Sequence, residues 1–154
     1  MPNSNNKPSN LYELCDLVAE AIEIQPKNYF QDKWVFNAKL CNGDDACGTA
    51  FCRAGWITAL METEEHNTAW WLENRNDYIR TSAQSLLLTA GIPKEAINNL
   101  FYFAGIDSPY NDAFHNANGR LGCDSGTPEY AKAGADGMRL FMAQYEEKLK
   151  AAKL

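Results

Sequence analysis

The feature that most constrains the fold is a set of small residues spaced through an apolar segment near the middle of the chain. The four members recur every three or four positions, which places them on one face of an α-helix: Gly48, Cys52, Gly55 and Ala59. Because little side-chain bulk covers this face, another element can approach it closely. Larger apolar residues such as Trp56 cover the other faces, and a helix that is apolar nearly all round is usually buried. We therefore expect a buried central helix over residues 50–61.

The first helix is expected to begin just after Asn10. Asn10 is a good N-cap residue, and Glu13 stands three positions later as a capping-box partner. Apolar residues follow at helical spacing and form one face: Leu11, Leu14, Cys15, Val18 and Ile22. Pro26 ends the helix. The other face carries a stripe of acids that we interpret as solvated: Glu13, Asp16, Glu20 and Glu23.

Two helices are expected in the next part of the chain. The first covers residues 78–90 and ends at Gly91, which suits the left-handed conformation of a helix C-cap. Pro93 then stands in the first turn of the second helix. The apolar face of that helix contains Ala96, Ile97, Leu100 and Phe101.

A last helix is expected near the C-terminus. Residues 127–129 supply a threonine cap, a proline at the first helical position and an acid in the first turn. Gly134 and Gly137 weaken the first half of this helix, which favours a start nearer Asp136. Its buried stripe contains Met138, Phe141, Met142, Tyr145 and Leu149.

These elements predict a mainly α fold. We expect a single compact helical domain of about five helices around the buried central helix, covering residues 11–150. The aromatic stretch from Tyr29 to Lys39 shows neither clean period, so we expect a short strand or an irregular segment before the central helix. Residues 1–10 are rich in Asn, Ser and Pro and are expected to be disordered, and residues 151–154 to form a tail.

The charge balance narrows the classes of partner. The chain has 14 Lys and Arg against 20 Asp and Glu, for a net charge of −6. This is not the basic footprint of a nucleic-acid-binding protein. We find no signal peptide and no apolar stretch near the ~20 residues that a membrane-spanning helix needs. We expect a cytoplasmic protein whose acidic surface serves solubility or docks on a basic protein, an expectation that the odd count of five cysteines supports.

Cys47 is the candidate nucleophile. A cysteine near a helix N-terminus feels the positive end of the helix dipole, which lowers the thiol pKa. Cysteine hydrolases pair such a thiolate with a histidine. The chain has two histidines, and of these His115 lies in a polar loop with Asp112, whereas His66 stands in an exposed stretch. A cysteine-dependent hydrolase or transferase that uses Cys47, His115 and Asp112 is therefore the first alternative function.

A structural zinc site is the second alternative. Cys41, Cys47 and Cys52, with His66 or Cys123, could supply four ligands. Structural zinc sites usually contain two cysteine pairs with two to four residues between the members of each pair. Here the intervals are five and four residues, and there is no second short pair. A disulfide between Cys47 and Cys52 would need Cys47 to lie outside the helix. The poor cysteine spacing favours a chain without a metal. The sequence also has no glycine-rich phosphate-binding motif, so we expect no other cofactor.

The block Cys47-Gly48-Thr49-x-x-Cys52-x-Ala54-Gly55-Trp56 resembles a motif of small uncharacterised proteins from bacteria and their phages. In those proteins an aromatic segment precedes the block, and a closing helix that contains Thr-Pro follows it. Similar elements occur here between Tyr29 and Leu149. The family has no established activity, so the resemblance implies no catalytic residue. A histidine often precedes its aromatic segment, where this chain has Asn28.

The leading expectation is a small, acidic, non-enzymatic protein-interaction module. We expect a phage or mobile-element protein that binds or inhibits a host or defence protein through its acidic surface or the Trp70-Trp71 region. In this interpretation the motif residues Cys47, Gly48, Thr49, Cys52, Gly55 and Trp56 are structural. Trp70 and Trp71 cannot both face one core from a helix, so one of them is a candidate interface anchor. Burial of both tryptophans in a turn is the equal alternative.

Overall fold

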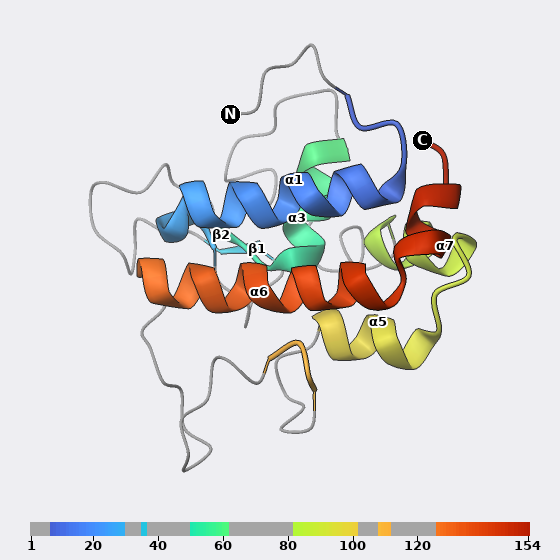
Figure 1. The fold of residues 1–154 in the computed structure, drawn as a ribbon. Coiled ribbons are helices and arrows are strands. Elements are labelled where there is room, and N and C mark those ends of the chain that lie inside the picture. The colour runs from blue at the N-terminus through green and yellow to red at the C-terminus, as the bar shows by residue number, and fades with distance from the viewer. Residues whose placement is uncertain (1–6, 30–34, 37–49, 62–81, 102–107, 112–125) are drawn as a thin grey trace.

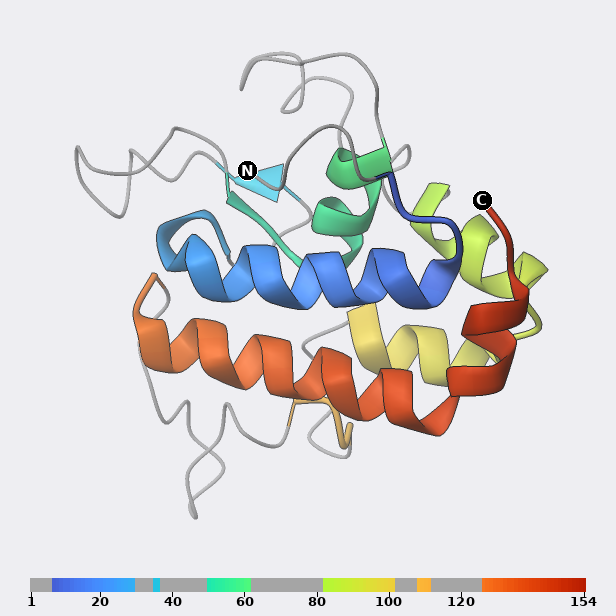
Figure 2. The same cartoon turned by 45° about the horizontal axis from the view of Figure 1, so that its top comes forward.

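Two long helices, α1 (Leu11–Ile24) and α6 (Pro128–Gln144), pack against each other and form the body of the computed structural model (Figure 1). They lie side by side and run antiparallel, as the turned view in Figure 2 also shows. The structure describes residues 7–29, 35–36, 50–61, 82–101, 108–111 and 126–154.

Shorter elements surround this pair. They are the 3-10 turn η1 (Pro26–Asn28), the strands β1 (Val35–Phe36) and β2 (Ala50–Phe51), and the helices α3 (Arg53–Met61), α5 (Lys94–Phe101) and α7 (Glu146–Ala151). A further helix, which Figure 1 does not label, covers residues 82–89. The helix α3 packs against α1 and α5 and is buried over its first two turns. The described residues are mainly α-helical, which confirms the expected fold class.

The start of α1 is capped as its sequence predicts. The Asn10 side chain accepts a hydrogen bond from the backbone N–H of Glu13 at 2.9 Å. The Glu13 carboxylate reaches back one residue further than in a capping box and accepts from the N–H and the hydroxyl of Ser9, at 2.7 and 2.9 Å. Every apolar residue of the predicted face is buried, Cys15 included. The helix ends at Ile24, two residues before Pro26.

The central helix begins later than expected. Residues 50 and 51 were predicted to be helical, but they pair antiparallel with β1, with Val35 opposite Phe51 and Phe36 opposite Ala50. The first backbone hydrogen bond of α3 joins the N–H of Trp56 to the carbonyl of Cys52. Helical periodicity does not reveal a strand partner that lies far away in sequence, so the local pattern extended the helix too far.

The two glycines of α6 do not delay its start. The helix runs without a break from Pro128, and the Thr127 hydroxyl caps it by accepting from the N–H of Tyr130 at 3.3 Å. The expected start nearer Asp136 is therefore wrong. A Cβ atom at Gly134 would lie 2.3 Å from the Tyr29 ring, and one at Gly137 would lie 2.0 Å from a backbone oxygen of another segment. The glycines are present because other groups approach the helix closely there.

The C-terminal helix is divided in two. α6 ends at Gln144, Tyr145 caps it, and α7 starts at Glu146 and packs against α1. The predicted stripe is buried at Met138, Phe141, Met142 and Leu149, while Tyr145 is partly buried. The segment after α7 then pairs with the residues before α1 through an isolated bridge between Asn10 and Lys153.

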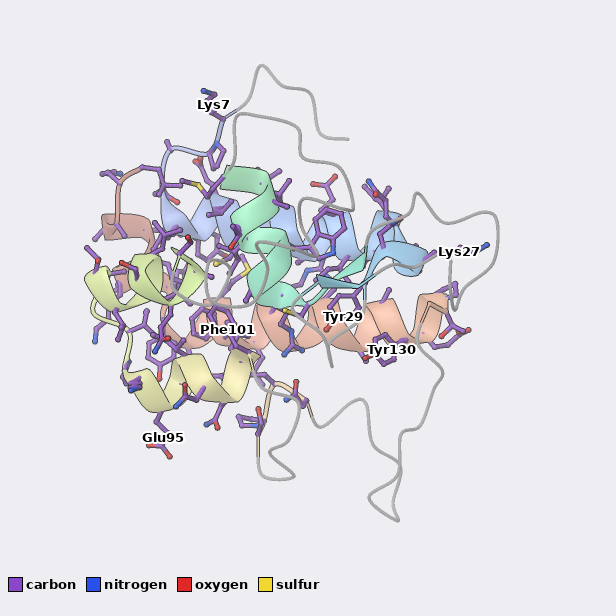
Figure 3. The ribbon with its side chains drawn as sticks, turned by 180° about the vertical axis from the view of Figure 1, so that it is seen from behind. Lys7, Lys27, Tyr29, Glu95, Phe101 and Tyr130 are labelled. Carbon is purple, nitrogen blue, oxygen red and sulfur yellow. The ribbon has the colours of Figure 1, made fainter. Side chains whose placement is uncertain are left out.

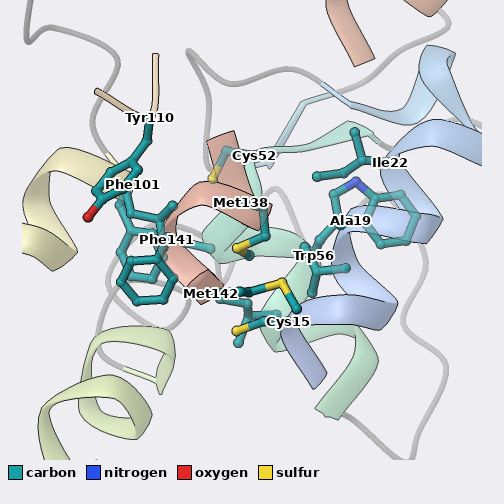
Figure 4. Close-up of a cluster of buried hydrophobic side chains, with 14 of the residues drawn as sticks. Cys15, Ala19, Ile22, Cys52, Trp56, Phe101, Tyr110, Met138, Phe141 and Met142 are labelled. Carbon is teal, nitrogen blue, oxygen red and sulfur yellow. The ribbon is translucent and has the colours of Figure 1, made fainter. Parts of the chain in front are cut away.

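The core lies between α1, α3 and α6. Cys15 from α1 lies near Met138 and Met142 from α6, with the Trp56 ring beside them (Figure 4). Gly91 adopts a φ of 84°, as expected for the left-handed cap of the preceding helix. None of the helices in the described ranges is long and apolar enough to cross a membrane.

Replacement of Gly134 by alanine is expected to destabilise the protein, although alanine is the better helix former. The added methyl group would overlap the buried Tyr29 ring, and overpacking of this kind costs about 1–3 kcal/mol. Urea denaturation measures the change in the free energy of unfolding. The exposed Ala143 of the same helix provides the control, because Ala143→Gly reports helix propensity alone. A gain in stability for Gly134→Ala would show that the ring does not lie against the helix.

Candidate functional site

The most unusual side chain in the described residues is Arg53, the first residue of α3. Its exposed fraction is 0%. The guanidinium donates hydrogen bonds from Nε to the carbonyl of Gly134 at 3.1 Å and from Nη1 to the carbonyl of Leu100 at 3.0 Å. Nη1 also donates to Oδ1 of Asn111 at 2.8 Å, and Nη2 to the carbonyl of Tyr110 at 2.6 Å. These contacts use the wide fan of donors that only an arginine offers.

The four acceptors belong to three different segments. Gly134 lies in the middle of α6, Leu100 in the last turn of α5, and Tyr110 and Asn111 in the turn at residues 108–111. The carbonyls in the last turn of a helix carry its negative end, which favours a cation. Asn111 is itself fully buried. One side chain therefore ties α3 to α5, to α6 and to a turn.

Aromatic rings cover the other side of this polar group. Tyr29 is fully buried and packs against Tyr130, with ring centroids 5.4 Å apart; Figure 3 labels both rings, which meet beside α6. Burial raises the pKa of the Tyr29 hydroxyl, and the nearby charge of Arg53 offsets only part of that effect. The indole N–H of Trp56 donates to the carbonyl of Asn28 at 3.2 Å. The motif tryptophan thus joins α3 to the turn that precedes Tyr29.

Cys52 stands at the N-cap of α3, directly before its first residue. The expected helix over residues 50–61 would have placed it inside the first turn. Its sulfur accepts a hydrogen bond from the N–H of Gly55 at 3.4 Å. Backbone hydrogen bonds and the Arg53 charge favour the thiolate, but burial opposes it more strongly and raises the pKa of Cys52 to about 11. Desolvation therefore outweighs the helix terminus. The folded protein therefore holds the proton of the Cys52 thiol more tightly than an ordinary cysteine does.

Most of the residues named in the catalytic, metal, motif and interface hypotheses lie outside the described residues. These are Cys41, Cys47, Gly48, Thr49, His66, Trp70, Trp71, Asp112, His115 and Cys123. Of the proposed motif set, the structure places Cys52, Gly55 and Trp56, and all three are buried. The described residues contain no group of three or more His, Cys, Asp or Glu side chains that could hold a metal ion.

Arg53, a polar residue within an apolar helix, was not singled out in the sequence analysis. Two signals pointed further. An arginine within an apolar run must find acceptors inside the protein, because burial of an unpaired charge costs several kcal/mol. A glycine inside a good helix, such as Gly137, marks a close approach by another group; a Cβ atom there would lie 2.3 Å from Nη2 of Arg53. Together they indicate an arginine that packs into the glycine face of another helix.

Comparison with protein families, curated proteins and solved structures gives no match. The resemblance to the small bacterial and phage proteins therefore stays a prediction based on the motif.

Replacement of Arg53 by lysine is expected to cost about 2–4 kcal/mol of stability, although the charge is kept. Lysine has three donors on one atom and cannot span acceptors in three segments, so buried carbonyls lose their partners. Urea denaturation provides the measurement. Arg139 pairs with Glu23 at the surface, so Arg139→Lys is the matched control and should change stability by less than about 1 kcal/mol. Equal effects of the two substitutions would refute the structural role of Arg53.

The buried Cys52 thiol predicts a loss of stability in alkaline solution. Its pKa rises on folding from an ordinary 9.0 to about 11, so the folded state holds the proton more tightly. The contribution is complete below pH 9 and is lost as the pH rises toward 11. Between about pH 8 and 10, the wild-type protein should lose about 1 kcal/mol more stability than Cys52→Ala in urea denaturation. An identical pH dependence for both would place the thiol in contact with water.

Proposed function

We propose that the chain is a small, acidic protein-interaction module that acts without catalysis and binds a basic surface of a protein partner. This proposal keeps the expectation of a phage or mobile-element protein that acts in the cytoplasm and binds or inhibits a host or defence protein. It includes no cofactor, nucleic acid or membrane partner.

The observation that carries the proposal is the use of the motif inside the protein. Arg53 is fully buried among carbonyls of α5, α6 and the turn at residues 108–111. Cys52 is buried with a raised thiol pKa, and Trp56 donates its indole N–H to the chain before Tyr29. These groups are buried and have their hydrogen-bond partners inside the protein. Motif residues that stabilise the core favour a protein that presents a rigid binding surface over one that catalyses a reaction.

The exposed face of α1 is the surface that the proposal assigns to the partner. Its four acidic residues are exposed and share one stripe: Glu13, Asp16, Glu20 and Glu23. Glu23 pairs with Arg139, and Glu13 accepts hydrogen bonds from Ser9. Asp16 and Glu20, in the middle of the stripe, form no ion pair within the described part of the chain. Charge complementarity at such a surface raises association rates and selects a basic partner.

No observation in the described residues favours the other two functions. The hydrolase or transferase depends on Cys47, His115 and Asp112, which lie outside them. The zinc module depends on Cys52 and on ligands outside them as well. In the structure the Cys52 sulfur caps α3 by accepting the N–H of Gly55. The interaction module is therefore the function we propose.

The test is affinity capture from a lysate of a bacterial host at low salt, with the Asp16→Asn/Glu20→Gln double variant as the probe of α1. We expect the wild-type chain to retain one basic protein in stoichiometric amount. The double variant should retain at least fivefold less, because both central charges are lost. Added salt should weaken the capture, since exposed charges are screened.

The control is Glu95→Gln/Glu147→Gln, which makes the same change in net charge at exposed acids of α5 and α7. It should capture the partner as the wild-type chain does. If both double variants lose the partner equally, net charge and not the α1 surface determines binding. If no basic protein is retained at low salt, the interaction proposal is wrong.

A further inference from the structure

A pocket of about 450 Å³ opens at the end of the molecule where the N-terminal part of α1 meets α7. Figures 1 and 2 show α7 beside the unlabelled helix of residues 82–89 at this end. The volume lies within the range of about 300–1,000 Å³ that is typical of small-molecule sites. The residues that line the pocket are Leu11, Ser85, Leu86, Thr89, Ala90, Lys148, Ala151, Ala152, Lys153 and Leu154.

Hydrogen bonds fix the walls of this pocket. The N–H of Leu11 donates to the carbonyl of Ala152 at 2.9 Å, and the N–H of Leu154 donates to the carbonyl of Ser9 at 3.0 Å. On the opposite side, Nζ of Lys148 donates to the carbonyl of Gly91 at 3.0 Å. The segment after α7 and the turn after residues 82–89 are thus held in place, so the pocket is preformed.

The pocket has an apolar floor and a polar rim. Its less exposed residues are Leu11, Leu86, Ala90 and Ala152. The exposed rim contributes two hydroxyl groups, from Ser85 and Thr89, and two ammonium groups, from Lys148 and Lys153. A pocket that combines an apolar floor with a few convergent polar groups is typical of sites for amphipathic ligands.

The charge of the rim contrasts with that of the whole chain. The net charge is −6, yet no aspartate or glutamate is among the described residues that line the pocket. On α6 and α7, Lys132, Arg139 and Lys150 form ion pairs with carboxylates. Within the described ranges Lys148 and Lys153 form none. The Glu13 carboxylate accepts hydrogen bonds from Ser9. It also attracts the charge of Lys153, but the two groups do not form an ion pair.

We propose that this pocket binds a free carboxylate that carries a medium-length hydrocarbon chain. The hydrocarbon lies over Leu11, Leu86 and Ala90, and the carboxylate meets the ammonium groups of Lys148 and Lys153 at the rim. Lys148 keeps its bond to Gly91, because an ammonium group has three donors. This inference is independent of the proposed function, since the pocket and the acidic face of α1 involve different charges.

The test is a titration with butyrate, hexanoate and octanoate, each below its micelle concentration, followed by the amide resonances in ¹H–¹⁵N NMR spectra. We expect shifts confined to Leu11 and to residues 85–91 and 148–154. Each added methylene should tighten binding about fourfold, as burial of a CH₂ group predicts. Octyltrimethylammonium, which carries the same chain with the opposite charge, should bind at least tenfold more weakly than octanoate.

Three variants assign the site. Thr89→Trp places a bulky side chain at the exposed rim and should abolish the shifts without removing a core residue. Lys148→Gln and Lys153→Gln should each weaken octanoate about two- to fivefold, as expected for exposed charge pairs. Lys132→Gln, at an exposed lysine of α6 outside the pocket, is the control and should leave octanoate binding unchanged.

The octanoate titration and the variants can each support or overturn the assignment of the pocket. Octanoate binding that follows chain length, fails for the cation and is lost in Thr89→Trp supports it. The proposal is overturned if octanoate causes no localised shifts at millimolar concentration. It is overturned equally if the cation binds as well as the carboxylate, or if Lys132→Gln weakens binding as much as Lys148→Gln does.

Discussion

The burial of the Arg53 guanidinium is the interaction on which the rest of the structure depends. An ion removed from water costs several kcal/mol unless good acceptors surround it, and here carbonyls from α5, α6 and the turn at residues 108–111 supply them. The acceptors lie 47 to 81 residues away in the chain. Their convergence fixes how α3 packs against elements that follow it in sequence. It also dictates composition elsewhere, since only a glycine at position 137 leaves room for the guanidinium.

The same burial determines the chemistry of the neighbouring cysteine. Cys52 is at a helix N-terminus beside a cation, a setting that lowers a thiol pKa when water can reach the sulfur. Here the thiol is enclosed, and burial raises its pKa to about 11. The residue types therefore resemble those of an activated nucleophile, whereas burial favours the protonated thiol. The motif residues that the structure describes are buried and stabilise the fold. This structural role is the reason that the proposed function is non-catalytic.

Features governed by neighbours in sequence were predictable. The cap at Asn10 and the left-handed Gly91 depend on a few adjacent residues, and the structure confirms them. The Thr127-Pro128 signal also marks the true start of α6, although the two glycines favoured a later one. Features governed by distant partners were not. The strand at residues 50–51 needs β1, and the glycines of α6 are explained by Tyr29 and by Arg53. The buried arginine itself was visible in the sequence, but its acceptors are backbone carbonyls and an asparagine, which no pattern of side chains reveals.

Hydrogen exchange of the Arg53 Nε–H group, followed by ¹⁵N NMR, tests the central claim most directly. This proton is bonded to the carbonyl of Gly134 inside the core, so its exchange requires a large opening of the structure. We expect protection close to that of the backbone amides of α1 and α6, while the Nε–H of the exposed Arg139 exchanges freely. Rapid exchange at Arg53, at the rate found for Arg139, would mean that water reaches the guanidinium and that the motif does not organise the core.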